Sequence, residues 1–252
     1  MITIHHLNDS RSQRVLWLLE ELGLPYEVKR YQRDAKTMLA PPELRALHPL
    51  GKSPVLDDGD VRVAETGAII EYLLEAYPAV RLRPAAGTEA ARRFTYWLHY
   101  AEGSAMTPLL LKLIFTAIPN RVPFLARGVA KGISKAVNAS MIDPQLASHT
   151  AFWEAELSRS AWFAGDAFSA ADIMMSFPVE AAGSRIGFGA DKPHLKAFLK
   201  TIHARPAYQR ALERGGLTAT PDSPAAGFGA TGRPRRSYSA TGRATPDCSE
   251  RL

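Results

Sequence analysis

The first eighty residues alternate between short apolar runs and apolar residues at helical spacing. Residues 2–7 and 26–31 have the length and composition of β-strands, and residues 15–22 repeat apolar side chains every three or four positions. Gly23 stands where a helix commonly ends, and Pro25 prevents that helix from continuing. This order predicts a strand, a helix and a second strand.

Residues 48–77 hold a second pattern, which predicts a β-hairpin followed by a helix. A short apolar run begins at Val55, directly after Pro54, and a glycine-containing turn separates it from another run at residues 61–64. Thr66 is then the predicted N-cap of a helix. The apolar positions of that helix recur at Ile69, Ile70, Leu73, Leu74 and Tyr77.

The composition changes along the chain and predicts three parts. Residues 1–80 hold the strand and helix patterns, and a linker containing proline and glycine follows them. Residues 88–217 are helical in pattern, with prolines bounding or kinking successive helices and a predicted break at Pro144. Residues 218–252 are rich in small and polar residues and nearly lack large apolar ones, so we expect a disordered tail there.

One local signal in the helical part has a structural and a chemical interpretation. Ser169 and Asp172 have the spacing of a capping box at a helix start, and Phe168 and Ile173 are placed to pack as a hydrophobic staple. Capping of the helix explains the Asp172 carboxylate, and no catalytic role is needed. We therefore leave Asp172 out of the predicted site.

Composition and charge exclude several classes of function. The 252 residues carry a formal net charge of +6, but no basic block alternates with aromatic residues, so we expect no nucleic-acid partner. The single cysteine, Cys248, cannot form an internal disulfide. We find no signal peptide and no uncharged apolar run of about 18 residues, so we expect a cytoplasmic protein without a transmembrane segment. His5 and His6 are adjacent on a strand and point to opposite faces, so no metal site is expected.

Two serines and an acid–hydroxyl pair are the candidates for chemistry. Ser10 is either an ordinary cap of the first helix or a hydroxyl that donates a hydrogen bond to a bound anion, and Ser12 is a second candidate on the same helix end. A thiolate held there would gain from both the hydroxyl and the helix dipole. Glu65 and Thr66 suit the ammonium and carboxylate of a free amino-acid end. If its peptide bond is cis, Pro54 turns the preceding backbone toward an extended peptide.

Four segments together resemble the cytosolic glutathione S-transferase family, and most of all its serine-type bacterial and fungal members. The segments are residues 10–15, 21–27, 51–56 and 65–69, in that order, and the similarity extends to about Gly216. The resemblance implies an α/β thioredoxin-like N-terminal domain followed by an all-α C-terminal helical domain. It also implies glutathione as co-substrate and a homodimer.

The resemblance further implies a role for each residue that matches the family pattern. Ser10 corresponds to the hydroxyl that stabilises the glutathione thiolate, and Lys52 to a position near the glycyl half of the tripeptide. Pro54 corresponds to a cis-proline, and the backbone of Ser53 is expected to pair with the cysteinyl part. Ser53 stands where Val or Ile is commoner, and we expect its side chain to have little effect.

The same resemblance assigns the two ends of the tripeptide. Glu65 and Thr66 correspond to the acid and hydroxyl that hold the γ-glutamyl end, with Thr66 in place of the commoner serine. The glycyl carboxylate needs a further cation, and Arg33 and Lys36 both lie in the right segment. The sequence does not decide between these two cations.

The expected function is the transfer of glutathione to a small hydrophobic electrophile. Two alternatives remain open: glutathione-dependent peroxide reduction or isomerisation, and a non-catalytic binding module of the same fold. The run at residues 109–119 is the most apolar of the chain, and a buried helix or a subunit contact explains it most simply. Four side chains are candidates for the electrophile pocket: Tyr96, Tyr100, Met106 and Phe115.

Overall fold

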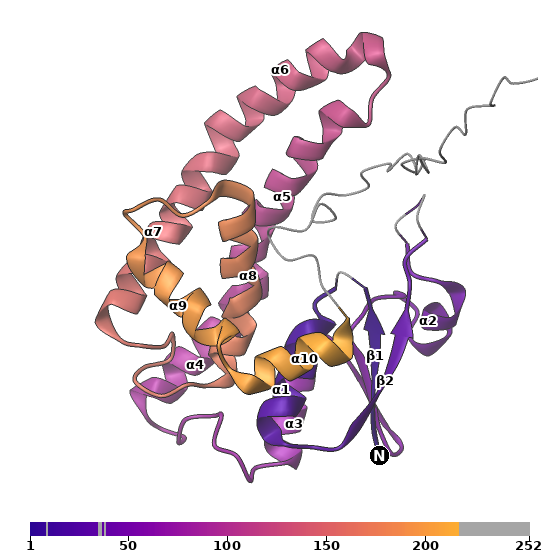
Figure 1. Ribbon diagram of the computed structural model, residues 1–252, viewed down its shortest axis with the longest axis vertical. Coiled ribbons are helices and arrows are strands. Elements are labelled where there is room, and N and C mark those ends of the chain that lie inside the picture. The colour runs from indigo at the N-terminus through magenta and orange to yellow at the C-terminus, as the bar shows by residue number, and fades with distance from the viewer. Residues whose placement is uncertain (9, 35–36, 38, 217–252) are drawn as a thin grey trace, which may run out of the picture.

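The computed structural model consists of a small mixed sheet with helices on both faces, next to a larger group of helices (Figure 1). It describes residues 1–8, 10–34, 37 and 39–216. The predicted tail at 218–252, with Cys248, and one candidate cation, Lys36, lie outside the described residues. An α/β N-terminal domain followed by an all-helical domain is the predicted fold class, and it is confirmed.

The sheet has four strands in the order β2-β1-β3-β4. β1 pairs with β2 in parallel and with β3 antiparallel, and β3 pairs with β4 antiparallel. A parallel pair requires a crossover, and the first helix supplies it, so the predicted strand–helix–strand unit is confirmed. The bounds are β1 Ile2–Leu7, α1 Ser12–Leu22, β2 Tyr26–Tyr31, α2 Pro42–Leu47, β3 Val55–Asp58, β4 Val61–Ala64 and α3 Thr66–Ala76.

The two faces of the sheet are covered by different helices. Alternate residues of β1 point to opposite faces. Ile2 and Ile4 belong to the main core with α1 and α3, whereas Leu7 packs with Tyr31 and Leu44 of α2 in a small separate cluster. Both faces are therefore closed, as expected for a sheet that contains a parallel pair.

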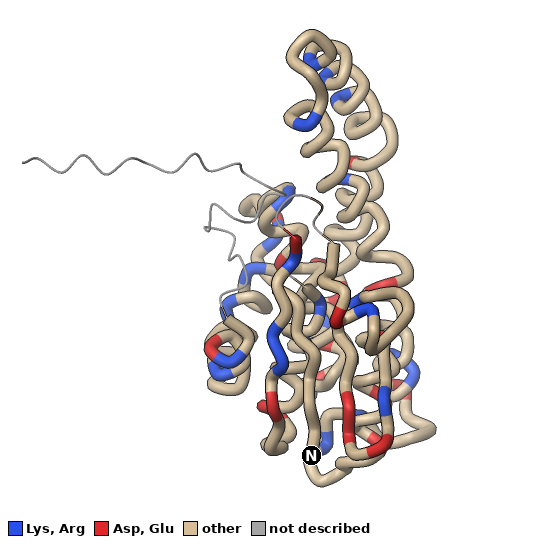
Figure 2. The backbone as a smooth tube through the Cα atoms, turned by 90° about the vertical axis from the view of Figure 1, so that its right-hand side faces the viewer, with Lys and Arg blue, Asp and Glu red and all other residues tan. Residues whose placement is uncertain are grey.

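The helical domain is built on a long antiparallel hairpin that rises away from the sheet (Figure 1). Figure 2 shows that the far part of this hairpin carries only basic residues among its charged ones. The bounds are α4 Glu89–Tyr100, a π-helical turn Ala101–Ala105, α5 Met106–Ala117, 3-10 turns Ile118–Asn120 and Phe124–Ala126, α6 Arg127–Val137, a π-helical turn Asn138–Ile142, α7 Asp143–Arg159, α8 Ala170–Ile186, α9 Pro193–His203 and α10 Pro206–Gly215.

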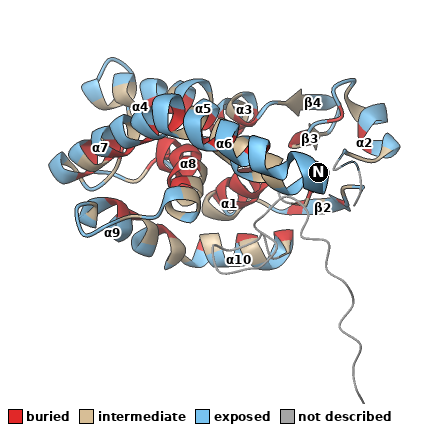
Figure 3. Ribbon diagram, turned by 90° about the horizontal axis from the view of Figure 1, so that it is seen from above, coloured by how far each residue is buried: buried red, intermediate tan, exposed pale blue. Residues whose placement is uncertain are grey.

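Helix α1 lies between the two domains and is buried on nearly every side. Nine of its eleven residues are buried, and it packs against α3 and β1 on the sheet side and against α8 and α10 on the other (Figure 3). The Trp17 ring meets the Tyr208 ring of α10 edge-to-face at 5.1 Å. Arg205 reaches Glu21 at 2.6 Å, so the C-terminal helix is tied back to the first one.

Several local predictions can be compared with the structure. Gly23 ends α1 with a φ of 64°, as predicted, and the capping box of Ser169 and Asp172 is present. Burial raises the pKa of Asp172 to about 6 despite three hydrogen bonds to its carboxylate, which is the environment of a structural acid. The prediction of Thr66 as N-cap is wrong by one residue, because the helix begins at Thr66 and Glu65 takes the cap position. Pro144 does not break the chain of helices but lies in the first turn of α7, directly after a π-helical turn.

One helical run, Glu89–Asn120, is long and apolar enough to cross a membrane by length and composition alone. No such run was expected from the sequence. Its first half, however, packs in the centre of the helical domain, where Phe94, Trp97 and Leu98 are almost completely buried. We interpret the run as a core helix of the domain.

A cluster of polar and charged side chains joins all four strands of the sheet. Asp57 of β3 lies 3.1 Å from His5 Nε2 and 2.6 Å from Arg62 Nε, and His5 Nδ1 lies 2.9 Å from the Tyr31 hydroxyl. The hydrogen bonds from Arg62 and then from His5 lower the pKa of Asp57 to about 2, from an ordinary value of 3.8. The ionised carboxylate therefore stabilises the fold at pH values above its ordinary pKa.

We expect Asp57→Asn to lower the free energy of unfolding at neutral pH, because Arg62 and His5 lose a charged partner. The loss should be only about 1 kcal/mol, because the Asp57–Arg62 ion pair is partly exposed. The stabilisation by a carboxylate with a lowered pKa is lost as the pH falls from the ordinary value of 3.8 through about 2. Urea unfolding of the two proteins should thus differ at neutral pH and converge in strong acid. Asp60→Asn in the exposed turn is the control, and a difference that persists in strong acid would contradict the assignment.

Candidate functional site

The sheet register brings three distant segments to one edge. Antiparallel pairing puts His5 opposite Val55, and Val55 opposite Ala64. The residues after β1, before β3 and after β4 must therefore lie at the same end of the sheet. Ser10, the Ser53–Pro54 dipeptide and Glu65 occupy those positions, so the register alone gathers most of the predicted site.

A chain of hydrogen-bonded side chains runs through this edge. Ser10 Oγ lies 2.7 Å from Ser12 Oγ, which lies 2.8 Å from His6 Nδ1. On its other side the Ser10 hydroxyl donates to Ser53 Oγ at 3.3 Å. The two serines that were alternatives in the sequence are thus direct partners. Both are buried at the start of α1, which limits the directions in which their hydroxyls can point.

The side chain of Ser53 takes part in the hydrogen bonding at this edge, in addition to its backbone. Its hydroxyl donates to the carbonyl of His5 at 2.9 Å and accepts from the backbone N–H of Leu7 at 3.2 Å, as well as from Ser10. Valine or isoleucine at this position could make none of these bonds. The Ser53–Pro54 peptide bond is cis, as predicted.

A cavity of about 190 Å³ opens beside Ser10. Of the predicted site residues, Ser10, Lys52 and Ser53 line it, and so does Arg33 of the two candidate cations. Its other lining residues are Leu7, Arg11, Leu39, Ala40, Arg45, Leu50, Gly51 and Phe177. In the described part of the chain, four cationic side chains and no carboxylate line the cavity, which suits a ligand with several negative charges.

Arg45 was missed in the sequence, although one signal pointed toward it. Its side chain crosses directly over Gly51, where an added Cβ would lie 2.6 Å from Arg45 Cγ. Gly51 also has a φ of 55°, a conformation that favours glycine. A glycine before Lys52 thus marks a close approach of another side chain, but the sequence alone does not say which one.

The remaining predicted residues lie at the same sheet edge but do not line this cavity. Pro54 is buried, Thr66 is buried at the first position of α3, and Glu65 is exposed. Glu65 has a φ of 73°, an unfavourable conformation for a residue with a side chain that costs about 1–2 kcal/mol. Such conformations persist where the surroundings impose them, and they are common at ligand sites.

The helical domain contributes the side chain of Phe177 to the cavity at Ser10. None of Tyr96, Tyr100, Met106 and Phe115 lines the cavity at Ser10. Tyr100, for example, is hydrogen-bonded to His149 and to Trp153 in the interior of its own domain. Phe177 lies in the middle of α8, where an apolar residue cannot be told from a core residue by spacing.

A buried arginine joins the two domains directly behind the cavity. Arg14 of α1 is 2% exposed, donates to the carbonyl of Met174 at 3.0 Å and pairs with Glu102. Arg11 binds the same Glu102 carboxylate at 2.9 Å, and the Phe177 ring lies over both guanidinium groups. Burial lowers the pKa of Arg14, and the Glu102 carboxylate opposes that shift. Glu102 thus compensates the buried charge of Arg14 and holds Arg11 at the cavity wall.

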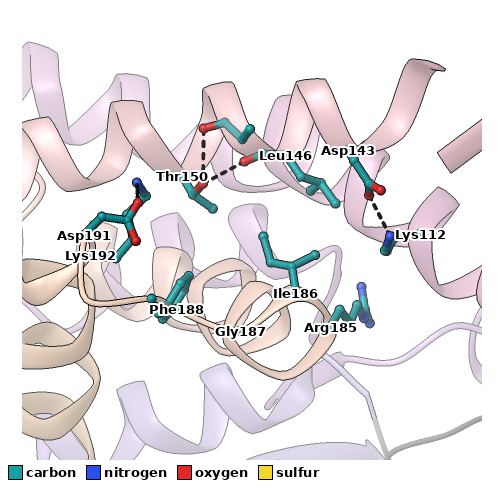
Figure 4. Close-up of a pocket in the computed structure, with 12 residues that line it drawn as sticks. Lys112, Asp143, Leu146, Thr150, Arg185, Ile186, Gly187, Phe188, Asp191 and Lys192 are labelled. Atoms are coloured by element: carbon teal, nitrogen blue, oxygen red, sulfur yellow. Dashed lines mark hydrogen bonds and ion pairs between the residues drawn. The ribbon is translucent and has the colours of Figure 1, made fainter. Parts of the chain in front are cut away.

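A larger cavity, of about 500 Å³, lies between α5, α7 and the end of α8 (Figure 4). It shares no lining residue with the cavity at Ser10. Lys112 pairs with Asp143 at 2.6 Å, and Lys192 with Asp191 at 2.6 Å, so most of its charges are matched within the protein. Among the described residues, no group of three His, Cys, Asp or Glu side chains could hold a metal ion there or elsewhere.

Comparisons with known families point in one direction. Residues 1–75 match the family described as "Glutathione S-transferase, N-terminal domain", and residues 138–206 match "Glutathione S-transferase, C-terminal domain". The chain is 36% identical to Glutathione S-transferase 1 of Saccharomyces cerevisiae over 228 residues, which cover 85% of this chain and 95% of the relative. It is 31% identical to Glutathione S-transferase 3 of Schizosaccharomyces pombe, over 85% of this chain and 88% of the relative.

Solved structures give the same result. A glutathione S-transferase from Actinobacillus pleuropneumoniae is 37% identical with a TM-score of 0.69, over 85% of this chain and 93% of that one. A theta class glutathione S-transferase from Xanthomonas axonopodis pv. citri, solved with glutathione bound, is 26% identical with a TM-score of 0.63, over 83% of this chain and 96% of that one.

We expect Glu102→Gln to destabilise the protein by about 2 kcal/mol, because the buried Arg14 guanidinium loses the carboxylate with which it is paired. Urea unfolding would measure the change. Glu71→Gln, which breaks the exposed pair with Arg83, is the matched control and should cost less than about 1 kcal/mol. Equal effects of the two substitutions would contradict a structural role for the buried pair.

Proposed function

The chain belongs to the cytosolic glutathione S-transferase family, and we propose that it joins the thiolate of glutathione to small hydrophobic electrophiles. The observation that carries this proposal is the Ser10 hydroxyl just before α1, which lines a cavity with four cationic side chains. We also propose that it acts in detoxification and in the cytoplasm.

The charges of the cavity complement the proposed ligand. Glutathione has two carboxylates and one ammonium group, and ionisation of its thiol adds a further negative charge. Arg11, Arg33, Arg45 and Lys52 surround the cavity. We assign the glycyl carboxylate to the side of Lys52 and Arg45, with Arg33 nearby, because these residues come from neighbouring segments before β3 and after β2. A field of this sign also favours the thiolate over the thiol.

Ser10 would act directly on the sulfur. A free thiol has a pKa near 8.5, so only a few per cent is ionised at neutral pH. A hydrogen bond from the Ser10 hydroxyl stabilises the charged form and lowers that pKa. Ser10 Oγ itself lies within hydrogen-bond distance of the Ser12 hydroxyl and of the Ser12 backbone N–H, at 2.7 and 3.4 Å. A donor that also accepts hydrogen bonds is polarised and becomes a stronger donor.

The ligand changes the partner of this hydroxyl. Ser10 donates to Ser53 Oγ at 3.3 Å, which is a long hydrogen bond. Rotation of the hydroxyl toward a bound sulfur loses little, since Ser53 keeps its bonds to His5 and Leu7. Ser53 thus holds the loop before Pro54 in position while Ser10 turns to the substrate. Bringing the electrophile beside the sulfur adds a proximity effect to this activation.

The other end of the tripeptide would bind at α3. The first N–H groups of a helix carry a partial positive charge, and the γ-glutamyl carboxylate fits there with the Thr66 hydroxyl as an additional donor. The exposed Glu65 carboxylate directly precedes these groups and suits the ammonium. The unusual backbone of Glu65 turns the chain sharply between β4 and α3.

We also propose a homodimer formed through one face of the helical hairpin. Leu110 and Ile114 lie four residues apart on α5, and Val129 and Ile133 lie four apart on α6, so each pair projects from one side of its helix. All four are exposed, as is Tyr96 earlier on the same long run. Exposed apolar residues gathered on one element commonly mark a contact with another protein.

Replacing Ser10 tests the chemical part of the proposal. We expect Ser10→Ala to raise the pKa of enzyme-bound glutathione by about one unit, equivalent to about 1.4 kcal/mol, and to lower kcat at least about tenfold, with little change in glutathione affinity. Ultraviolet absorbance of the thiolate across pH measures the first effect. Ser158→Ala, an exposed serine on α7, is the control.

The outcomes separate the alternatives. An unchanged thiolate pKa in Ser10→Ala would contradict the assignment and transfer the role to Ser12. Glutathione that binds without ionising would favour a non-catalytic module. Thiolate formation with peroxide reduction, but without conjugation, would favour the peroxidase alternative.

Replacing the exposed leucine and isoleucine tests the dimer. We expect Leu110→Glu/Ile114→Glu to be monomeric by sedimentation velocity where the unmodified chain is a dimer, because burying two carboxylates in an apolar contact is unfavourable. Val80→Glu, at an exposed position in the linker, should leave the assembly unchanged. A dimer that survives the double substitution would place the contact elsewhere.

A further inference from the structure

The far end of the helical hairpin exposes large apolar side chains. We use the name hairpin tip for residues 121–127, which end at the first residue of α6 (Figure 1). Phe124 is 77% exposed and Leu125 is 93% exposed. Side chains of this size are rarely left almost fully in water unless a partner covers them.

The charges around the hairpin tip have a single sign. Between Glu102 and Asp143 the sequence has five basic residues and no acidic residue. Lys112, the first of them, pairs with Asp143 at the base of the hairpin. The other four are exposed: Arg121 and Arg127 belong to the tip, and Lys131 and Lys135 lie farther along α6.

The side chains of α6 include a buried pair and a separate row of basic residues. Ala130 and Ser134 are buried, and they lie four residues apart on one side of the helix. Arg127 and Lys131 are also four apart and form a basic stripe, which Lys135 continues. With a rise of 1.5 Å per residue, Lys131 lies about 6 Å and Lys135 about 12 Å behind Arg127 along the helix axis. The apolar side chains therefore lie at the tip itself, and the cations lie at increasing distances from it along α6.

We propose that the hairpin tip docks on an anionic lipid surface. Phe124 and Leu125 would enter the boundary between headgroups and acyl chains, which interfacial side chains penetrate by about 5–10 Å. At that depth Arg127 and Lys131 reach the plane of the lipid phosphates. The Arg127 guanidinium already lies 6.0 Å from the Phe124 ring centroid, so the aromatic and the cation move together. Binding through so few side chains is weak and reversible.

A lipid surface explains the tip better than the other occupants do. In a two-fold contact between copies the same patch faces itself, which would oppose cation to cation. The chain beyond residue 217 has five arginines against three acids, so it lacks the complementary charge as well. Nucleic acid would use the cations but leave Leu125 exposed to water. The proposal does not depend on the proposed transferase activity.

Vesicle flotation of the full chain tests the proposal. We expect binding to vesicles made of equal parts phosphatidylcholine and phosphatidylglycerol, little binding to phosphatidylcholine alone, and loss of binding at high salt. Phe124→Ser/Leu125→Ser should reduce the partition coefficient at least about tenfold. Arg127→Gln/Lys131→Gln should reduce it about thirtyfold, since each basic residue near the surface contributes about a factor of five.

Two exposed lysines on α9 provide a matched control for the loss of charge. Lys196→Gln/Lys200→Gln removes two exposed charges from α9, away from the tip, and should leave vesicle binding unchanged. All variants should keep the oligomeric state and the far-ultraviolet circular dichroism of the unmodified chain. Equal binding to neutral vesicles, or retention of binding by either tip variant, would overturn the proposal. A change of oligomeric state in Phe124→Ser/Leu125→Ser would make the tip a subunit contact, and tighter binding to duplex DNA than to vesicles would make it a nucleic-acid surface.

Discussion

The burial of α1 between two domains is the constraint on which the rest of the structure depends. Nine of its eleven residues are buried, and one of them, Arg14, carries a charge. A buried guanidinium is tolerated only with partners that replace water, and here they come from the helical domain: the Met174 carbonyl and the Glu102 carboxylate. The N-terminal domain therefore cannot keep α1 in this environment without the helices that follow it.

The chemistry of the site follows from that placement. Ser10 and Ser12 lie at the buried start of α1, so packing along the whole helix sets the directions of their hydroxyls. The same Glu102 that holds Arg14 also holds Arg11 at the cavity wall, which links the docking of the domains to the electrostatics of the site. Phe177 of α8 closes the cavity from the other domain. Stability and activity thus share one set of contacts, whereas the hairpin tip lies outside it.

Local patterns predicted the elements well where a single physical rule decides the outcome. The parallel strands, the glycine end of α1 and the capping box of α8 each depend on residues close in sequence. Thr66 was misplaced because cap preference assumes an ordinary backbone at the preceding residue, and Glu65 instead has a positive φ. The role of the Ser53 hydroxyl was missed because its partners, His5 and Leu7, are more than forty residues away. Phe177 was missed for the same reason, because it reaches the cavity from α8, whereas Arg45 was missed although it crosses Gly51, only six residues away.

The sequence by itself determined the order of elements, the two-domain architecture and the candidates Ser10, Pro54, Glu65 and Thr66. These depend on periodicity, turn chemistry and the spacing of a few motifs, all of which are local. Tertiary structure alone decided that Arg11 and Arg45 join Lys52 at the cavity, which aromatic ring lines it and which apolar residues remain exposed. Those outcomes depend on contacts between segments far apart in the chain, and no local preference specifies them.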